Sequence, residues 1–304
     1  MYGLKVLVTG ASGFIGGHLV EELPRQGHEV IAFDKKTSDR VSSEEFVKGD
    51  IISFNFDEIL EDTDVVFHLA GLLGTTELFH RIIEAERVNV LGTLNLLESM
   101  RKKGVRQIIF TSKPNVWKHN VYTITKENCE RYLEMYQEIY GFRVVITRPF
   151  NVYGPREYLT EYRKAIPYFI VAALTNKPLE VFGDGEQTMD AIYVSDAVKA
   201  LTLCIEKSPE ETVEIGSSEP IKVKALAKKT IEITNSKSEV LYKPMRKGET
   251  SPQYICANGN MEQLLGFKPM IGLEEGLKKT VEWYRENLDK FREIYEFTEE
   301  DFYT

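Results

Sequence analysis

A glycine-rich turn joins the first two elements that the sequence predicts. It reads Gly10-Ala11-Ser12-Gly13-Phe14-Ile15-Gly16 and lies between an apolar run at residues 5–9 and helix-period apolar residues at 14–23. The glycines allow a tight turn, and they let backbone N–H groups approach a pyrophosphate at the N-terminus of the helix. The spacing is GxxGxxG and not the commoner GxGxxG. The turn therefore predicts a strand–turn–helix unit that binds a dinucleotide.

A carboxylate, Asp34, ends the second apolar run, which spans residues 29–33. A carboxylate at this place accepts hydrogen bonds from the adenosine ribose hydroxyls and repels a 2′-phosphate. The residue therefore favours NAD over NADP. Lys35 and Lys36 follow it directly, and their charge could neutralise a phosphate.

The first half of the chain alternates apolar runs with helix-period segments. Further apolar runs lie at residues 65–69, 107–110 and 143–147, and helix-period segments lie at 88–100 and 126–140. Nearly continuous apolar runs between helices indicate a parallel sheet that is covered on both faces. We therefore predict an α/β fold with a Rossmann-type doubly wound parallel sheet.

The pattern changes after residue 150. Prolines recur from Pro155 to Pro269 and the elements become short and mixed, which is typical of a smaller α+β lobe. We expect residues 1–150 to form a cofactor-binding domain, with a later segment at about 186–205 returning to it. Residues 151–304 would then form mainly a C-terminal substrate-binding lobe and a tail.

Charge and composition exclude several classes of protein. The formal net charge is −9, which disfavours a nucleic-acid partner because that binding relies on Lys and Arg. No apolar run approaches the roughly 18 residues of a membrane helix, and the first residues lack the layout of a signal peptide. Cys129, Cys204 and Cys256 lie far apart, and the histidines show no metal-binding spacing. We expect a cytoplasmic protein with no metal site.

A tyrosine and a lysine stand four residues apart in the segment Tyr122-Thr123-Ile124-Thr125-Lys126. On a helix they lie on one face, one turn apart. The lysine ammonium would stabilise the phenolate and lower the pKa of the tyrosine. A tyrosine prepared in this way can take a proton from a sugar hydroxyl while hydride leaves the same carbon.

Several motifs in a fixed order resemble those of a known family. They are Gly10–Gly16, Asp34, Gly49-Asp50-Ile51, His68-Leu69-Ala70-Gly71, Asn89-Val90-Leu91-Gly92-Thr93, Tyr122 with Lys126, Arg148–Arg156, Phe182–Thr188 and Tyr193-Val194-Ser195-Asp196. From about residue 4 to 285 the chain resembles the extended short-chain dehydrogenase/reductases, the NAD-dependent epimerases and dehydratases of nucleotide sugars, in particular those like UDP-glucose 4-epimerase. The resemblance implies a UDP- or dTDP-linked sugar as substrate.

The resemblance also implies a role for each matching residue. Tyr122 looks like the catalytic base and Lys126 like the residue that tunes it. The residues implied in cofactor binding are Gly10, Gly13, Phe14, Ile15, Gly16, Asp34, Asp50, Ile51, Leu69, Ala70, Gly71, Asn89, Thr111, Tyr122, Lys126 and Pro149. Those implied in substrate binding are Thr75, Thr76, Asn151, Ala165, Val181, Phe182 and Arg246.

One departure from the family pattern concerns the residue that contacts the reacting sugar hydroxyl. Relatives place a Ser or Thr where this chain has Lys113. A lysine can donate a hydrogen bond to the sugar oxygen, and its charge would lower the pKa of Tyr122 further. Alternatively, Lys113 points to water, with Thr111 or Ser112 in its place.

The connection from Val116 to Tyr122 is a second departure, because relatives usually have a longer loop there. A short loop leaves the pocket more open, and Gly74-Thr75-Thr76-Glu77 is the best candidate to cover it. Glu77 is then either an additional acid/base group or a first-turn helix residue that faces water. Pro114 and Asn115 occupy the places of the Asp–Glu pair of sugar 4,6-dehydratases, which disfavours that mechanism.

We therefore expect an NAD-dependent enzyme that oxidises a nucleotide sugar at C4 and reduces it again as the 4-epimer. The first alternative is a dehydratase that uses Glu77 or Lys113 as its additional group. The second is a protein that binds NAD and a nucleotide sugar in a degenerate site. The amphipathic helices at 88–103 and 126–140 resemble those that pair across a two-fold axis in relatives, which implies a homodimer.

Overall fold

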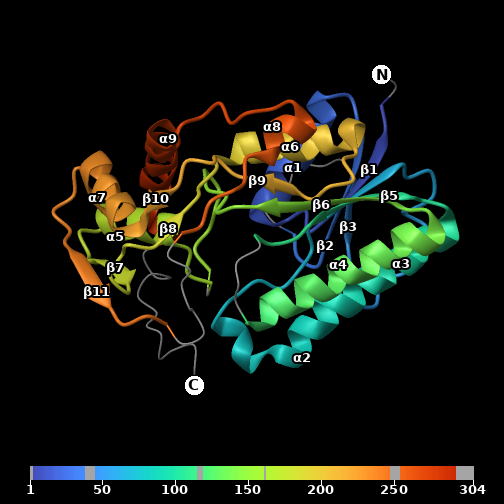
Figure 1. The fold of residues 1–304 in the computed structure, drawn as a ribbon, viewed down its shortest axis with the longest axis horizontal. Coiled ribbons are helices and arrows are strands. Elements are labelled where there is room, and N and C mark those ends of the chain that lie inside the picture. The colour runs from blue at the N-terminus through green and yellow to red at the C-terminus, as the bar shows by residue number, and fades with distance from the viewer. Residues whose placement is uncertain (1–2, 38–44, 115–118, 161, 247–253, 292–304) are drawn as a thin grey trace.

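A seven-stranded parallel sheet is the centre of the computed structural model, which describes residues 3–37, 45–114, 119–160, 162–246 and 254–291 (Figure 1). The strand order is β3-β2-β1-β4-β5-β6-β9. The strands are β1 (Lys5–Thr9), β2 (Glu29–Asp34), β3 (Glu45–Lys48), β4 (Val65–His68), β5 (Gln107–Thr111), β6 (Arg143–Pro149) and β9 (Val213–Ile215). The chain builds outward in one direction from β1 and in the other from β4. The point between these two strands is where open α/β sheets bind ligands, at the carboxyl ends of the strands.

Helices cover both faces of this sheet, which confirms the predicted fold class. On one face α1 (Phe14–Arg25) packs against α6 (Val194–Lys207), and α8 (Asn260–Leu265) lies beside α6 and β9 (Figure 1). On the other face lie α3 (Gly92–Lys103) and α4 (Val121–Tyr140), preceded by the short α2 (Ile82–Ala85). No helix in the described ranges is both long enough and apolar enough to cross a membrane.

The strands are apolar throughout because each contributes to two cores. On β1, Val6 and Val8 belong to the core under α1 and α6, whereas Leu7 belongs to the core under α3 and α4. Alternate side chains of a strand point to opposite faces, so a strand that is covered on both sides needs apolar residues at every position. This requirement explains the continuous apolar runs of the sequence.

The helix predicted over residues 88–100 begins differently from the expectation. A π-helical stretch over Glu86–Leu91 precedes α3, so the segment is not one regular α-helix. The helix predicted over 126–140 is α4, which begins five residues earlier than expected, at Val121. Asn120 caps α4, since its Oδ1 accepts a hydrogen bond from the Thr123 N–H at 2.8 Å.

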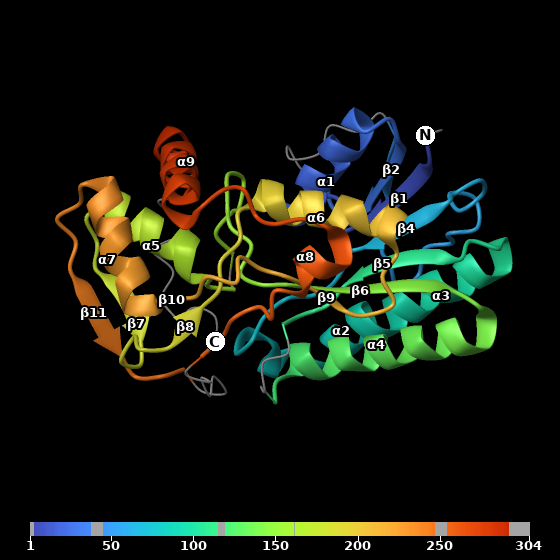
Figure 2. The same ribbon diagram turned by 45° about the horizontal axis from the view of Figure 1, so that its top comes forward.

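A smaller lobe packs beside the large sheet (Figure 2). It contains α5 (Ala165–Leu174), β7 (Leu179–Phe182), β8 (Thr188–Met189), β10 (Ile221–Lys222), α7 (Val223–Thr234), β11 (Val240–Lys243) and α9 (Leu273–Glu286). β7 pairs with β11 in parallel and β8 pairs with β10 antiparallel. Two short 3₁₀ turns complete the elements, at Glu77–His80 and Leu288–Lys290.

The core under α1 and α6 continues into this lobe and includes Leu179, Val181 and Tyr284. The segment at about 186–205, which we expect to return to the large sheet, contains β8 and most of α6. The helix α6 packs on α1 beside that sheet, whereas β8 pairs with β10 within the lobe. The division into two functional domains stays a prediction, and residues 292–304 of the expected tail lie outside the described residues.

Gly276 of α9 tests how closely the lobe packs. A Cβ atom at this position would lie 2.1 Å from the phenol oxygen of the buried Tyr153. Alanine normally favours a helix over glycine by about 1 kcal/mol. Here we expect Gly276→Ala to lower the free energy of unfolding in urea by about 1–3 kcal/mol, because the tyrosine ring must shift. Gly272→Ala, at the N-cap of the same helix, is the comparison without a clash, because nothing lies within 4 Å of its new Cβ and only the poorer cap weakens it. Equal stability of the two variants would contradict this packing.

Candidate active site

Two adjoining cavities lie where the carboxyl ends of the sheet strands meet the lobe. The sheet cavity has a volume of about 310 Å³ and is lined by the glycine turn and by residues at the ends of β4, β5 and β6. The lobe cavity has a volume of about 220 Å³ and lies between α5, β7 and β8. The residues that line both cavities are Asn151, Val152, Tyr162, Lys164 and Ile255. Because they share these residues, the two cavities form one continuous cleft from the sheet to the lobe.

The glycine turn forms one wall of the sheet cavity. Gly10 has φ +74°, and a Cβ there would lie 2.7 Å from the Ala70 nitrogen. A Cβ at Gly16 would lie 2.1 Å from the Gly10 carbonyl oxygen. Gly13, the N-cap of α1, has no side chain, and the described part of the chain supplies no other cap to this helix end. Its first N–H groups are therefore placed to bind an anion.

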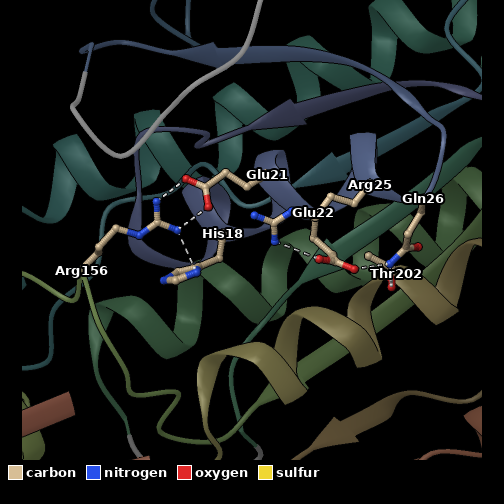
Figure 3. A network of polar contacts seen from close by, with 7 residues as sticks. All are labelled: His18, Glu21, Glu22, Arg25, Gln26, Arg156 and Thr202. Carbon is tan, nitrogen blue, oxygen red and sulfur yellow. Dashed lines mark hydrogen bonds and ion pairs between the residues drawn. The ribbon is translucent and has the colours of Figure 1, made fainter. Parts of the chain in front are cut away.

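A set of contacts fixes α1 to the loop that follows β6 (Figure 3). Arg156 forms an ion pair with Glu21 and donates a hydrogen bond of 2.9 Å to Nδ1 of His18. Since Nδ1 accepts, the other ring nitrogen carries the hydrogen and donates to the Pro155 carbonyl at 2.9 Å. The helix behind the glycine turn is thereby held against the loop whose first residues, Asn151 and Val152, line both cavities.

The predicted ribose carboxylate, Asp34, lies at the end of β2 beside this turn. Its two oxygens accept hydrogen bonds from the N–H groups of Ser12 at 3.0 Å and Lys36 at 3.1 Å. Lys35 forms an ion pair of 2.8 Å with Asp50, and this contact lowers the pKa of the Asp50 carboxyl. Lys35 is thereby directed to Asp50, although water screens this exposed pair, and Asp34 remains the residue that favours NAD.

Tyr122 and Lys126 both line the sheet cavity, one turn apart on α4. Lys126 is 3% exposed, and its Nζ lies 4.2 Å from the centroid of the Phe110 ring. Burial lowers the pKa of Lys126 to about 8. Burial also raises the pKa of Tyr122, with a smaller contribution from the Tyr162 phenol. In the ligand-free protein the pKa of Tyr122 is therefore raised and not lowered as expected, because burial disfavours the phenolate.

The end of β5 places three consecutive residues in the sheet cavity. Thr111 has a buried hydroxyl oxygen with no hydrogen-bond partner among the described residues, so a ligand can satisfy it. Ser112 donates its hydroxyl to the Glu130 carboxylate, which also forms an ion pair of 2.6 Å with Arg148. Its hydroxyl is therefore committed to the protein interior.

Lys113 lies in the cavity and is not directed to bulk water. The residue is 7% exposed, and its Nζ lies 3.1 Å from a carboxylate oxygen of Glu127. Pro114 follows it in the cavity wall, whereas Asn115 and Val116 lie outside the described residues.

The segment that was expected to cover the pocket contributes one lining residue, Thr75. Glu77 accepts a hydrogen bond of 2.8 Å from the Thr75 N–H and lies 3.5 Å from Arg246, which lines the lobe cavity. The Glu77 side chain is 12% exposed, so it does not face water. The ion pair thus connects the sheet side of the cleft to the lobe side.

Some of the predicted residues lie behind the cavities. Asn89 is 2% exposed; its Oδ1 accepts from the Leu72 N–H at 2.6 Å and its Nδ2 donates to Thr125 at 2.9 Å. It therefore fixes the loop after β4 against α4. Those that line neither cavity are Asp34, Asp50, Ile51, Ala70, Asn89, Thr76, Glu77 and Val181. The remaining predicted residues line one or both cavities.

Lys164 and Gln187 are among the lining residues for which the sequence predicts no role. Lys164 forms an ion pair of 2.6 Å with Glu157, and its Nζ lies 5.7 Å from the Phe14 ring centroid. Gln187 has a buried carbonyl oxygen with no hydrogen-bond partner among the described residues, while its amide donates to the Phe182 carbonyl at 2.7 Å. Lys164 follows an irregular loop with no periodic pattern, so only the folded structure brings it to the cleft.

Comparison with known proteins agrees with this geometry. The chain is 33% identical to UDP-N-acetyl-alpha-D-glucosaminuronate decarboxylase of Bacillus cytotoxicus, over 93% of this chain and 98% of that protein. It is 32% identical to the human dTDP-D-glucose 4,6-dehydratase, over 96% of this chain and 93% of that protein. The structure of a UDP-glucose 4-epimerase from Thermotoga maritima, determined with UDP-glucose, superposes with a TM-score of 0.86 at 31% identity, over 94% of this chain and 100% of that one.

A family model described as the NAD dependent epimerase/dehydratase family matches residues 6–216. The family's cofactor fits the site, because the sheet cavity combines a glycine cradle, an uncapped helix end and the Thr111 hydroxyl. Since the match covers more than half of the 304 residues, this chain belongs to the NAD-dependent epimerase/dehydratase family and is an NAD-dependent enzyme.

Proposed function

We propose that the protein is a nucleotide-sugar 4-epimerase. It would oxidise the sugar hydroxyl at C4 to a ketone and reduce that ketone again from the opposite face. The observation that carries this proposal is the placement of Tyr122 and Lys126 in the sheet cavity, next to a lobe cavity lined by Arg246. The Thermotoga maritima enzyme, named as a UDP-glucose 4-epimerase, supports the assignment.

The residues proposed to hold NAD lie along the edge of the large sheet. The glycine turn and the start of α1 would bind its pyrophosphate, and Asp34 would accept hydrogen bonds from the adenosine ribose. Thr111 and Lys126 would contact the nicotinamide half. When bound, NAD supplies a hydride acceptor that can return the hydride within the same cycle.

Tyr122 would move the proton of the reacting hydroxyl. Its phenol is protonated at neutral pH in the ligand-free protein, since burial raises its pKa. Lys126, with a pKa of about 8, keeps most of its charge at pH 7. A filled cavity excludes water and strengthens the effect of that charge on the phenol. Proton removal therefore becomes favourable only once the ligands are in place.

The lobe cavity would bind the nucleoside diphosphate. Arg246 presents a guanidinium that matches phosphate oxygens, and Asn151 lies where the two cavities meet. The Asn151 amide is oriented by a hydrogen bond of 2.8 Å to the Asp190 carbonyl. We propose a UDP- or dTDP-linked sugar with its sugar toward Tyr122.

Dehydration stays the second candidate. A dehydratase needs an additional acid/base group, and the residues considered for this were Glu77 and Lys113. Glu77 pairs with Arg246 and lies outside the lining of the sheet cavity, which leaves Lys113 as the only one of the two beside Tyr122. Epimerisation needs no such group and is therefore preferred.

A proton NMR time course distinguishes the candidates. The protein with NAD receives UDP- and dTDP-linked glucose, galactose, N-acetylglucosamine and glucuronate in separate tubes. A new anomeric signal that reaches equilibrium without net NADH indicates an epimerase. A deoxy-keto product indicates a dehydratase, and binding without any product indicates a degenerate site.

Replacement of the proposed base gives a sharper test. We expect Tyr122→Phe to lower kcat by about 10²–10⁴-fold, because the sugar hydroxyl loses its proton acceptor. NAD affinity should change little, and calorimetry measures it. Tyr132→Phe, at a half-exposed position of the same helix, is the matched control and should retain activity. Turnover of Tyr122→Phe at the control rate would exclude Tyr122 as the base.

The buried lysine makes stability depend on pH. In the folded protein the pKa of Lys126 is about 8, against an ordinary value of 10.5. The unfolded chain binds more protons between these values, so the penalty is full below pH 8 and is relieved as pH rises toward 10.5. We expect Lys126→Met to raise the free energy of unfolding of the NAD-free protein by about 2 kcal/mol at pH 7 and by less than half of that at pH 9.5.

Chemical unfolding at the two pH values measures this difference, and turnover of the same variant should be lost. Lys228→Met, on an exposed position of α7, is the control and should change stability little at either pH. A destabilised Lys126→Met protein at pH 7 would show that the charge is better solvated than its burial indicates.

We further propose a homodimer in the cytoplasm. The exposed face of α4 carries Ile124, Tyr132, Met135 and Ile139, the last being 61% exposed. These residues form one apolar stripe at helical spacing, which a second copy can cover. The three cysteines are free thiols, in keeping with a reducing compartment.

The mass in solution tests the proposed dimer. Light scattering should give about twice the chain mass of 34.9 kDa. Ile139→Glu places a charge in the stripe and should shift the protein toward a monomer. Gln137→Glu, which places the same charge at an exposed position on the other side of the helix, is the control. A monomeric wild-type protein would rule out the proposal.

A further inference from the structure

The charge inside the sheet cavity is one-sided. Three lysines line it, namely Lys113, Lys126 and Lys164, and no Asp or Glu does so within the described part of the chain. The NAD pyrophosphate is an anion in this cavity, but the glycine turn and the start of α1 are proposed to bind it. A neutral sugar needs no further cation, because burying an ammonium costs free energy unless a partner compensates it. We therefore compare the three lysines to find which one lacks a compensating negative charge within the protein.

Lys126 and Lys164 are accounted for by other contacts. Lys126 is the deeply buried partner of Tyr122 in the proposed proton transfer. Lys164 is compensated inside the protein by Glu157, whose side chain is 4% exposed. Neither needs an additional anionic group on the sugar.

Lys113 differs from both. Its side chain is 9% exposed, but the side chain of Glu127, the carboxylate that pairs with it, is 51% exposed. Water screens a half-exposed carboxylate, so this pair contributes little stabilisation. Glu127 also does not line the cavity, whereas Lys113 does. Lys113 therefore adds to the cavity that Tyr122 also lines a cation whose partner is screened by water and lies outside the cavity.

We propose that the sugar of the natural substrate carries a carboxylate, as in a nucleotide-linked hexuronate, and that Lys113 binds it. The inference rests on the proposed function, since the sugar must lie beside Tyr122. The carboxylate carbon of a hexuronate is attached to C5, next to the reacting C4. A lysine reaches further than a serine or threonine at the same position, and its ammonium binds a carboxylate as a compact charge.

The diphosphate does not account for this charge. Arg163 and Arg246 line the lobe cavity, where the nucleoside diphosphate is proposed to lie, and Lys113 does not line that cavity. The proposed carboxylate site is therefore separate from the phosphate site, and each has its own cation.

The experiment compares charged and neutral sugars that share one nucleotide. We measure kcat/KM for UDP- and dTDP-linked glucuronate and galacturonate, and for the corresponding glucose and galactose compounds, as loss of the starting anomeric signal, so that any product counts. The wild-type enzyme should prefer the uronates by at least about tenfold. Lys113→Met should lower that preference by about 10–100-fold, the amount expected for a hydrogen bond to a charged group. Lys113→Arg should keep most of it, and Glu127→Gln, the matched control, should not reduce it.

A binding measurement separates this inference from the proposed function. Calorimetry on NAD-loaded Tyr122→Phe protein gives the affinities for UDP-glucuronate and UDP-glucose without turnover. Tighter binding of the uronate that Lys113→Met abolishes supports the inference even where no epimer forms. Equal affinity for the two sugars, or an equal loss for both in Lys113→Met, overturns it. An equal loss for both sugars would mean that Lys113 contacts a part of the substrate that both sugars share.

Discussion

The close approach of α1 to the end of β1 is the constraint on which the rest of the site depends. The space beside the Gly10 carbonyl is so narrow that a Cβ at Gly16 would lie 2.1 Å from its oxygen. Only glycine at position 16 lets the first turn of α1 lie this close to the end of β1. The uncapped end of α1 is thereby set against the edge where β4, β5 and β6 end. The parallel register then brings Thr111 level with Thr147, so residues from different strands gather at one edge.

This edge is stabilised less well than the sheet behind it. Lys126 loses part of its solvation on burial, as its lowered pKa shows, and the Thr111 hydroxyl has no partner among the described residues. Each of these features costs free energy in the ligand-free protein. A ligand that satisfies them stabilises the folded state by mass action. The cores on the two sheet faces supply the stability that allows such a site to persist.

Periodicity predicted the sheet and its flanking helices because those signals are local. The alternation of apolar runs and helices is set by burial on both faces, and the turn at Gly10 marks where the first strand ends. The same reasoning brought Tyr122 and Lys126 to one cavity, since their spacing alone places them one turn apart. It gave the wrong direction for the Tyr122 pKa, because the burial that raises this pKa comes from the folded structure and not from local spacing.

Contacts between segments that are distant in the sequence could not be predicted from local patterns either. The ion pair of Glu77 with Arg246 joins the sheet side of the cleft to the lobe side, and neither residue carries a local signal for the other. Lys164 reaches the cleft only because its loop packs against Phe14. The Asn89 amide accepts a hydrogen bond from the Leu72 N–H, and the path of this loop after β4 is not specified by the sequence. Packing of whole elements decides all three.

The chemistry of such a site is decided by few residues. Proteins that are named as a decarboxylase, a dehydratase and an epimerase share about a third of their residues with this chain and cover nearly all of it. A shared scaffold with a shared cofactor cannot by itself distinguish those reactions. The difference must lie in the side chains beside the reacting carbon. In this chain the cavity that Tyr122 lines is also lined by Lys113 and Pro114, a cation and an inert ring. Neither is a carboxylate, and no Asp or Glu of the described ranges lines the sheet cavity, so its described lining holds cations but no carboxylate that could remove a proton.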